Sequence, residues 1–265
     1  MELFGNNEQR AMMKRGAALR QITKNDPRFS YYGRNVALTE YSSDAVELVS
    51  HLSLIQGASS CLYVQVDRSE EFKSAIDNLG FMTDQFELWQ GGDTALAASE
   101  NIVKKRKLPS DLEVVDIGPD TPGEIMAGLN EVTESCGVLL PLGSVMRGLD
   151  APSVCKLAMD SDGVPVASAA AVAFNHPNGA HCKDVWWGML ATREDRRGEG
   201  IAIIMGAMAM LFMHQHHGFS NFTTGIRQGN EASERLCQKL GFSSGKYQLI
   251  AALDPKQFTG GRMTK

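Results

Sequence analysis

The stretch Gly188-Met-Leu-Ala-Thr-Arg-Glu-Asp-Arg-Arg-Gly-Glu-Gly-Ile-Ala202 is the part of the chain from which the fold is best predicted. Residues 186–192 are typical of a buried strand, and the apolar run 203–212 after the glycines predicts a helix. A strand that ends in glycines at a helix start presents unpaired backbone N–H groups and the positive end of the helix dipole. Such a turn binds phosphate groups, so the sequence predicts a phosphate-bearing ligand.

Two common phosphate-binding motifs do not fit this stretch. A P-loop requires Lys followed by Ser or Thr after its second glycine, and this pair is missing. A dinucleotide-binding G-x-G-x-x-G pattern fails because Ile203 occupies the position of its third glycine. Both ligand classes are therefore excluded for this turn.

The turn resembles the coenzyme A loop of the GNAT acyltransferase superfamily. Its residues Arg197-Gly198-Glu199-Gly200-Ile201-Ala202 match the pattern R-x-x-G-x-A. Residues 230–242 are similar to the second signature of that family, N-x-x-A-x-x-L-Y-x-K-x-G-F, and match it at Asn230, Leu236, Lys239, Gly241 and Phe242. The resemblance covers residues 112–254 and implies an α/β (α+β) fold with a mixed, mostly antiparallel sheet flanked by helices.

Composition and charge limit the remaining possibilities. The chain is 43% hydrophobic and 22% charged, as in ordinary globular proteins, and its net charge of −5 argues against nucleic-acid or anionic-membrane partners. Its five scattered cysteines favour reduced thiols and no metal site. No signal peptide or long apolar run is present, so we expect a cytoplasmic monomer or homodimer. The basic run 104–107 is interpreted as a solvated linker face, with a docking site as the alternative.

The first half of the chain repeats the order of elements expected in the second half. A helix ending at Gly57, a strand over 61–66, a helix over 69–78 and a strand over 86–90 follow one another. One ungapped shift superposes Gly57 on Gly218 and Leu79-Gly80-Phe81 on Leu240-Gly241-Phe242. We therefore predict two tandem GNAT-like units, a degenerate domain over 1–108 and an acetyltransferase domain over 109–265.

The same shift places Arg197–Ala202 on Val36–Tyr41, which contains neither glycine nor arginine. The first unit is therefore expected to be structural, or to help shape the substrate pocket. In the second unit we predict a strand over 112–117, a helix over 121–135, an apolar loop over 136–143 and an antiparallel meander with strands over 154–159, 164–174 and 182–192.

The resemblance implies a binding mode for acetyl-coenzyme A as co-substrate. Backbone groups of Met189, Leu190 and Ala191 would pair with the pantetheine arm. Asn230 would contact the same arm or cap its own helix. Arg193 and Arg196 could add phosphate contacts, and the main phosphate cradle would be Arg197, Gly198, Glu199, Gly200, Ile201 and Ala202. The alternative is that the glycines only allow tight packing of helix on sheet.

Catalytic residues are less well defined. By resemblance, the Leu190 N–H would polarise the thioester carbonyl while an amine attacks directly. In the family a Tyr at this position often acts as the general acid that protonates the departing thiolate. Here the position is Cys237, which is either that acid or an inert buried thiol. No motif identifies a base; Glu134, His181 and Asp184 are candidates, or surface residues. Acceptor-pocket walls are expected from 136–143 and Trp187, although Trp186 and Trp187 must face opposite sides of their strand.

These observations predict an acyl-coenzyme A-dependent N-acyltransferase. The acetyl group would pass to the amine of a small molecule or amino acid. A non-catalytic protein that binds coenzyme A, or has a structural role, is the alternative, because the replacement of the Tyr by Cys237 would permit loss of turnover.

Overall fold

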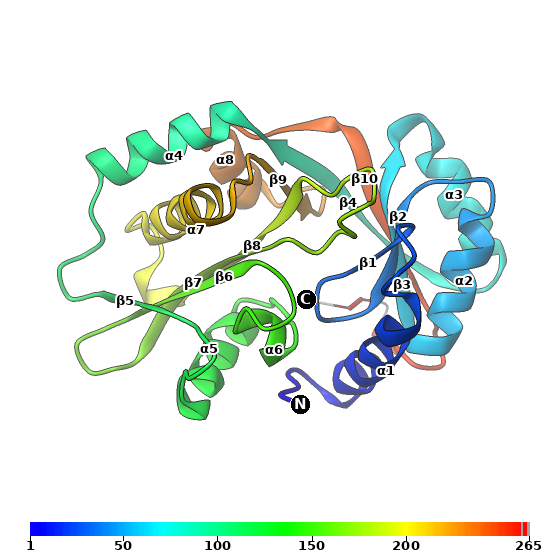
Figure 1. Cartoon of the computed structure of the whole chain (residues 1–265), viewed down its shortest axis with the longest axis horizontal. Coiled ribbons are helices and arrows are strands. Elements are labelled where there is room, and N and C mark those ends of the chain that lie inside the picture. The colour runs from blue at the N-terminus through cyan, green and yellow to red at the C-terminus, as the bar shows by residue number, and fades with distance from the viewer. Residues whose placement is uncertain (261, 264–265) are drawn as a thin grey trace.

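The computed structural model describes residues 1–260 and 262–263 of the chain, and its strands form one continuous sheet (Figure 1). The strand order is β1-β2-β3-β10-β4-β9-β8-β7-β6-β5. In the described residues, pairing is parallel between β2 and β3 and between β8 and β9, and antiparallel between the other neighbours. The predicted mixed, mostly antiparallel α+β architecture is confirmed. The strands are β1 (Phe29–Tyr31), β2 (Val36–Glu40), β3 (Ala58–Gln65), β4 (Met82–Gly91), β5 (Glu113–Asp116), β6 (Ser153–Met159), β7 (Pro165–Val172), β8 (Asp184–Thr192), β9 (Asn221–Ile226) and β10 (Ser243–Leu253).

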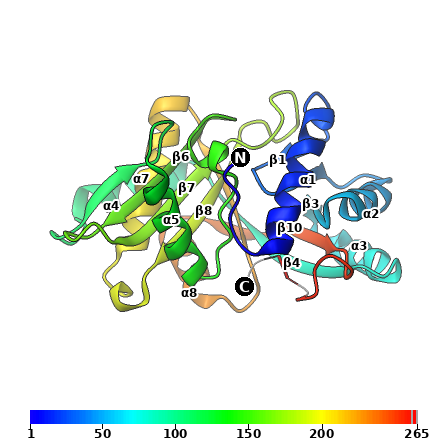
Figure 2. The same ribbon diagram turned by 90° about the horizontal axis from the view of Figure 1, so that it is seen from below.

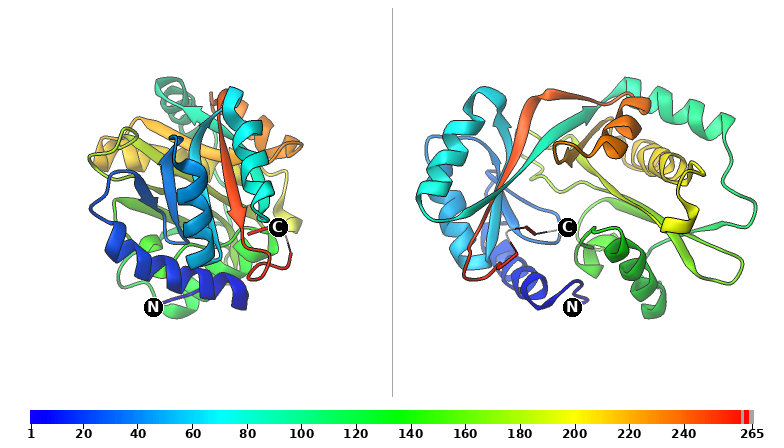
Figure 3. Two further views of the ribbon diagram at one scale, coloured as in Figure 1. Left: turned by 90° about the vertical axis from the view of Figure 1, so that its right-hand side faces the viewer. Right: turned by 180° about the vertical axis from the view of Figure 1, so that it is seen from behind.

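Helices cover both faces of the sheet where β6, β7 and β8 lie. There α7 packs against the three strands with α4 beside it, and α5 and α6 lie on the opposite face (Figures 1 and 2). At the other end of the sheet α2 and α3 pack on β3 and β10, and α1 packs on α2 (Figure 3). The helices are α1 (Asn7–Thr23), α2 (Ala45–Gln56), α3 (Val66–Asn78), α4 (Asp93–Lys105), α5 (Gly123–Ser135), α6 (Gly143–Met146), α7 (Ile201–His217) and α8 (Glu231–Lys239).

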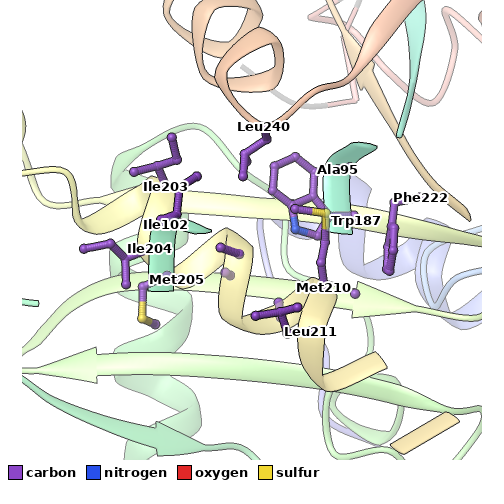
Figure 4. Close-up of a cluster of buried hydrophobic side chains, with 14 of the residues drawn as sticks. Ala95, Ile102, Trp187, Ile203, Ile204, Met205, Met210, Leu211, Phe222 and Leu240 are labelled. Carbon is purple, nitrogen blue, oxygen red and sulfur yellow. The ribbon is translucent and has the colours of Figure 1, made fainter. Parts of the chain in front are cut away.

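The core between α7 and the sheet is built around Trp187 (Figure 4). This side chain is 1% exposed, stacks on Phe242 with ring centroids 5.0 Å apart, and donates its indole N–H to the Gly206 carbonyl at 2.9 Å. Side chains of α7 supply most of the surrounding core. The helix is apolar nearly all round, and it is stable here because most of its side chains are buried between the sheet and α4.

The two units predicted from the sequence do not appear as separate sheets. Strand β10, from the end of the chain, lies between β3 and β4 of the first half, and β4 pairs with β9 of the second half. The six strands β2-β3-β10-β4-β9-β8 have the same pattern of pairing from either end: one parallel pair, then antiparallel pairs toward the middle. Each half supplies a strand to the other, which joins the halves into one sheet.

The ungapped shift between the halves is wrong at one point. It places Val36–Tyr41 on the glycine turn, whereas residues 36–40 are strand β2. The parallel pairing of β2 with β3 resembles that of β8 with β9. The connection from β2 to α2, residues 41–44 (Tyr-Ser-Ser-Asp), also lacks glycine and arginine.

Candidate functional site

The glycine stretch forms a turn between β8 and the start of α7. Gly198 and Gly200 have φ angles of +87° and +79°, which residues with a Cβ rarely adopt. Gly200 is the N-cap of α7, and no side chain caps the helix there. A Cβ built on Gly198 would meet no atom within 4 Å, so the turn is open on that side. Backbone N–H groups of the first turn of α7 can therefore bind an anion.

Beside this turn, β8 separates from β9 and forms a bulge against β7. Its parallel pairing with β9 runs from Asp184↔Asn221 to Trp186↔Thr223. On the β7 side a register shift leaves Met189 and Leu190 outside the ladder as far as the described pairs go. Met189 has a φ of +53°, the one positive value at a described residue other than glycine. Such a bulge turns backbone groups away from the sheet, where a ligand can pair with them.

A cavity of about 1060 Å³ is lined by the turn, the bulge and the separated strands, and also by residues 32 and 34 of the first half. It is lined by no carboxylate in the described part of the chain, although the net charge of the protein is −5. A basic lining of this kind favours a ligand with several negative charges. The charged side chains that line it are all basic: Arg34, Arg106, Arg196, Arg197, Arg227, Arg235, Lys239 and Arg262.

The arginines near the turn differ in their availability. Arg193 is paired with Asp195 at 2.7 Å, and Arg196 is paired with Glu199 at 2.7 Å as well as with Asp111. Arg197 donates from Nε to the Thr192 carbonyl at 3.2 Å and makes no ion pair with a described residue. Glu199 therefore orients Arg196 in this structure.

Arg106 also reaches the turn, which the sequence interpretation missed. Its Nη1 would lie 3.5 Å from a Cβ built on Gly200. The residue follows the last turn of α4, and α4 packs on α7. The basic run 104–107 is thus more than a solvated linker, because one of its members lines the cavity. The charge run itself is visible in the sequence, but the place that Arg106 reaches depends on the packing of α4 on α7.

Several residues of the second signature line the same cavity, among them Asn230, Leu236, Cys237 and Lys239. Asn230 Oδ1 accepts a hydrogen bond from the Ser233 N–H at 3.3 Å, so this side chain caps α8. Cys237 is 2% exposed, and burial raises the pKa of its thiol to about 12. A thiol with that pKa is a weak proton donor, which favours the inert alternative for Cys237.

The other end of the cavity has an aromatic wall. Trp186 and Trp187 both line the cavity. Trp186 lies at this end, with its ring centroid 5.9 Å from that of Tyr32, while most of the Trp187 side chain is buried in the core beside α7. The expectation that Trp187 forms an acceptor wall stays a prediction, and Trp186 joins it as a second candidate. Phe174 packs edge-on against Tyr32 at 5.9 Å. Residues 136–138 of the predicted apolar loop also line the cavity, and Cys136 lies near the glycine turn, where its Sγ donates to the Thr192 carbonyl at 3.3 Å.

A hydrogen-bond network leads from the cavity wall toward the surface. The Tyr63 hydroxyl donates to Asp184 Oδ2 at 2.9 Å, and His181 Nδ1 lies 2.9 Å from the same oxygen. His181 Nε2 lies 3.2 Å from Glu40 Oε1, and its ring stacks on Tyr63. Of the predicted base candidates, the structure brings His181 and Asp184 together here, while Glu134 borders a different cavity.

Among the described residues, none of the helices has the length and hydropathy of a membrane span. Nor does this part of the chain gather three or more His, Cys, Asp or Glu side chains into a group able to hold a metal ion.

No protein-family model matches the sequence, and comparison with curated proteins finds no match. Solved structures do match. A GCN5-related N-acetyltransferase from Kribbella flavida superposes with a TM-score of 0.57 at 13% identity, over 85% of this chain and 82% of that one. A GCN5-related N-acetyltransferase-like protein from Streptococcus suis superposes with a TM-score of 0.54 at 16% identity, over 84% and 82%.

The protein has a GNAT-like fold. A tandem GNAT protein from the clavulanic acid biosynthesis pathway also matches, with a TM-score of 0.54 at 12% identity, over 82% of this chain and 74% of that one. At these identities the likeness concerns the fold alone. In this GNAT-like fold, the glycine turn and the bulge of β8 border one cavity.

Proposed function

We propose that this protein is an N-acyltransferase that moves an acetyl group from acetyl-coenzyme A to the amine of a small molecule or amino acid. One observation carries the proposal: a single cavity joins an uncapped helix N-terminus, a bulged strand separated from its neighbour, and a charged lining that is entirely basic. A diphosphate with a long polar arm fits these features. The GNAT-like fold supports the same ligand.

The chain's own residues have distinct tasks in this scheme. The N–H groups of the first turn of α7, with Arg197 and Arg106, hold the phosphates of the co-substrate. Backbone groups of Met189, Leu190 and Ala191 align its pantetheine arm. The Leu190 N–H polarises the thioester carbonyl, so that a neutral amine held opposite attacks it directly.

We also propose that the chain is a tandem GNAT protein, with units at 1–108 and 109–265. The support is the strand order, in which β2-β3-β10 corresponds to β8-β9-β4, together with the glycines that end corresponding helices, Gly57 and Gly218. The first unit has no glycine turn at 41–44. Its role is to wall the acceptor end of the cavity with Tyr32, Arg34 and Tyr63.

Removal of the amine proton is assigned to Tyr63 and its partner Asp184. Cys237 is assigned no part in catalysis, and the departing thiolate takes its proton from solvent. Burial and the carboxylate of Asp184 raise the pKa of Tyr63 well above its ordinary value, so the hydroxyl stays protonated and can pass its proton to Asp184 as it accepts another. Tyr63→Phe is expected to lower kcat about a hundredfold or more, the usual size of general acid–base catalysis. Cys237→Ala is expected to keep kcat within about twofold, since an inert buried thiol contributes little.

Steady-state kinetics of the two variants, with coenzyme A affinity measured in parallel, separate these roles. Both variants are expected to bind coenzyme A as the parent does. A large loss of kcat in Cys237→Ala, with Tyr63→Phe unaffected, would restore Cys237 as the proton donor.

The function itself is tested by thiol release from acetyl-coenzyme A in the presence of an amine panel, beside thermal unfolding with coenzyme A alone. A ligand at one hundred times its Kd stabilises the folded state by about 2.7 kcal/mol, which for a chain of this size raises Tm by about 5–10 °C. A Tm shift with no thiol release from any amine would favour the non-catalytic alternative. No shift and no release would contradict both.

A further inference from the structure

Arg34 is a buried cation with no negative partner. The residue is 7% exposed and lines the acceptor end of the cavity. It makes no ion pair with any residue that the structure describes. One Nη donates to the Leu139 carbonyl and the guanidinium is hydrogen-bonded to the Tyr32 side chain, but Nε has no hydrogen-bond partner. An arginine cannot release its proton to escape this situation. Burial of an uncompensated charge is costly, so the site is incomplete as it stands.

The nearby groups do not neutralise this charge. The guanidinium lies 5.3 Å from the ring centroid of Tyr32 and 5.6 Å from that of Trp186. Aromatic faces attract a cation but carry no formal charge. Asp184 and Glu40, two carboxylates in this part of the molecule, are engaged with Tyr63 and His181.

The backbone holds Arg34 firmly in this place. Gly33 has a φ of +88°, and a Cβ there would lie 2.8 Å from Val145 Cγ2, so the chain packs closely on the segment after the apolar loop. The Leu142 N–H donates to the Gly33 carbonyl at 2.9 Å, and the side-chain amide of Asn35 donates to the Ala58 carbonyl at 3.0 Å. These bonds hold the residues on either side of Arg34, and the bond to the Leu139 carbonyl holds its guanidinium, which lowers the entropy lost on binding a partner.

We propose that Arg34 binds a carboxylate carried by the acceptor, so that the acceptor is an α-amino acid or a related amino carboxylate with an apolar side chain. This inference rests on the proposed function. A planar guanidinium matches a carboxylate with two parallel N–H donors, and the unpartnered Nε is one of them. The apolar body of the acceptor packs against the aromatic and aliphatic side chains of the same wall: Tyr32, Leu62, Leu88, Phe174, Trp186 and Leu249.

The direct test uses no turnover. N-acetylphenylalanine and its uncharged amide are titrated calorimetrically into the full chain without coenzyme A. Charge-assisted hydrogen bonds predict that the carboxylate binds about tenfold to a hundredfold more tightly than the amide. Equal affinities of the carboxylate and the amide would overturn the proposal.

Variants then assign the preference to Arg34. Arg34→Met is expected to abolish it, Arg34→Lys to restore it in part, and Arg68→Met, an exposed change on α3, to leave it intact. If Arg34 only braced the loop at Leu139, Arg34→Met would lower Tm and weaken both ligands equally. Loss of the carboxylate preference, with amide binding retained, is the result that supports the proposal.

Kinetics separate this inference from the proposed function. The KM for phenylalanine is expected to lie well below that for phenethylamine, which lacks only the carboxylate. Acetyl transfer to both amines with equal KM would overturn the role of Arg34 while leaving the acyltransferase intact. Absence of transfer to any amine would count against the proposed function, whereas the titrations would still decide the carboxylate site.

Discussion

Gly200→Glu is expected to weaken coenzyme A binding by at least about a hundredfold while the protein still folds. The new carboxylate would stand at the N-terminus of α7, where the phosphates are proposed to bind. Two like charges about 4 Å apart repel by about 4 kcal/mol at the effective dielectric of a protein surface, which exceeds the roughly 2.7 kcal/mol of a hundredfold loss. Calorimetric titration with coenzyme A measures the effect.

Two control variants separate charge from backbone strain. Gly200 has a φ of +79°, so any side chain there costs about 1–2 kcal/mol of conformational strain. Gly200→Ala introduces that strain alone and is expected to lower Tm with a smaller effect on affinity. Gly163→Glu adds the same side chain at a φ of +76° in the β6–β7 hairpin and should leave affinity unchanged. Unaltered affinity in Gly200→Glu would contradict the assignment of the turn.

Gly206→Val is expected to destabilise the protein by about 3 kcal/mol or more. A Cβ on Gly206 would lie 2.6 Å from Trp187 Cζ2 and 3.2 Å from Leu190 Cδ2. The indole cannot move away readily, because it is hydrogen-bonded to the Gly206 carbonyl and stacked on Phe242. Overpacking of this kind costs about 1–3 kcal/mol, and the valine adds two further methyl groups in the same space.

Gly206→Ala has two opposing effects on stability, a gain in helix propensity and a close contact with Trp187. Gly206→Ala gains about 1 kcal/mol of helix propensity, so a net loss of stability would show that the contact with Trp187 outweighs it. Gly123→Ala at the start of α5 adds a Cβ with no atom within 4 Å and should leave Tm unchanged or raise it. Calorimetric unfolding of the set gives the comparison; a stable Gly206→Val would mean that α7 can shift on the sheet.

The candidate site was predictable where its geometry is local. Glycines with positive φ, a strand before them and an apolar helix after them are all encoded within residues 186–217, and the structure forms each of these elements there. Arg34, Arg106 and Tyr63 were not predicted as site residues. No pattern around them marks them, because they line the cavity only after the first half of the chain folds against β8 and β9.

The sequence by itself determined most of the elements, their order and the glycine turn. These depend on backbone angles, helix ends and hydrophobic periods that act over a few residues. Only the tertiary structure decided that β10 inserts between β3 and β4, and that Trp187 rather than Trp186 enters the core. A strand can pair with any suitable strand edge, so its neighbours do not follow from its sequence. The alternation of side chains along a strand assigns Trp186 and Trp187 to opposite faces of the sheet, but it does not say which face is covered by α7. Contacts between distant residues make both choices.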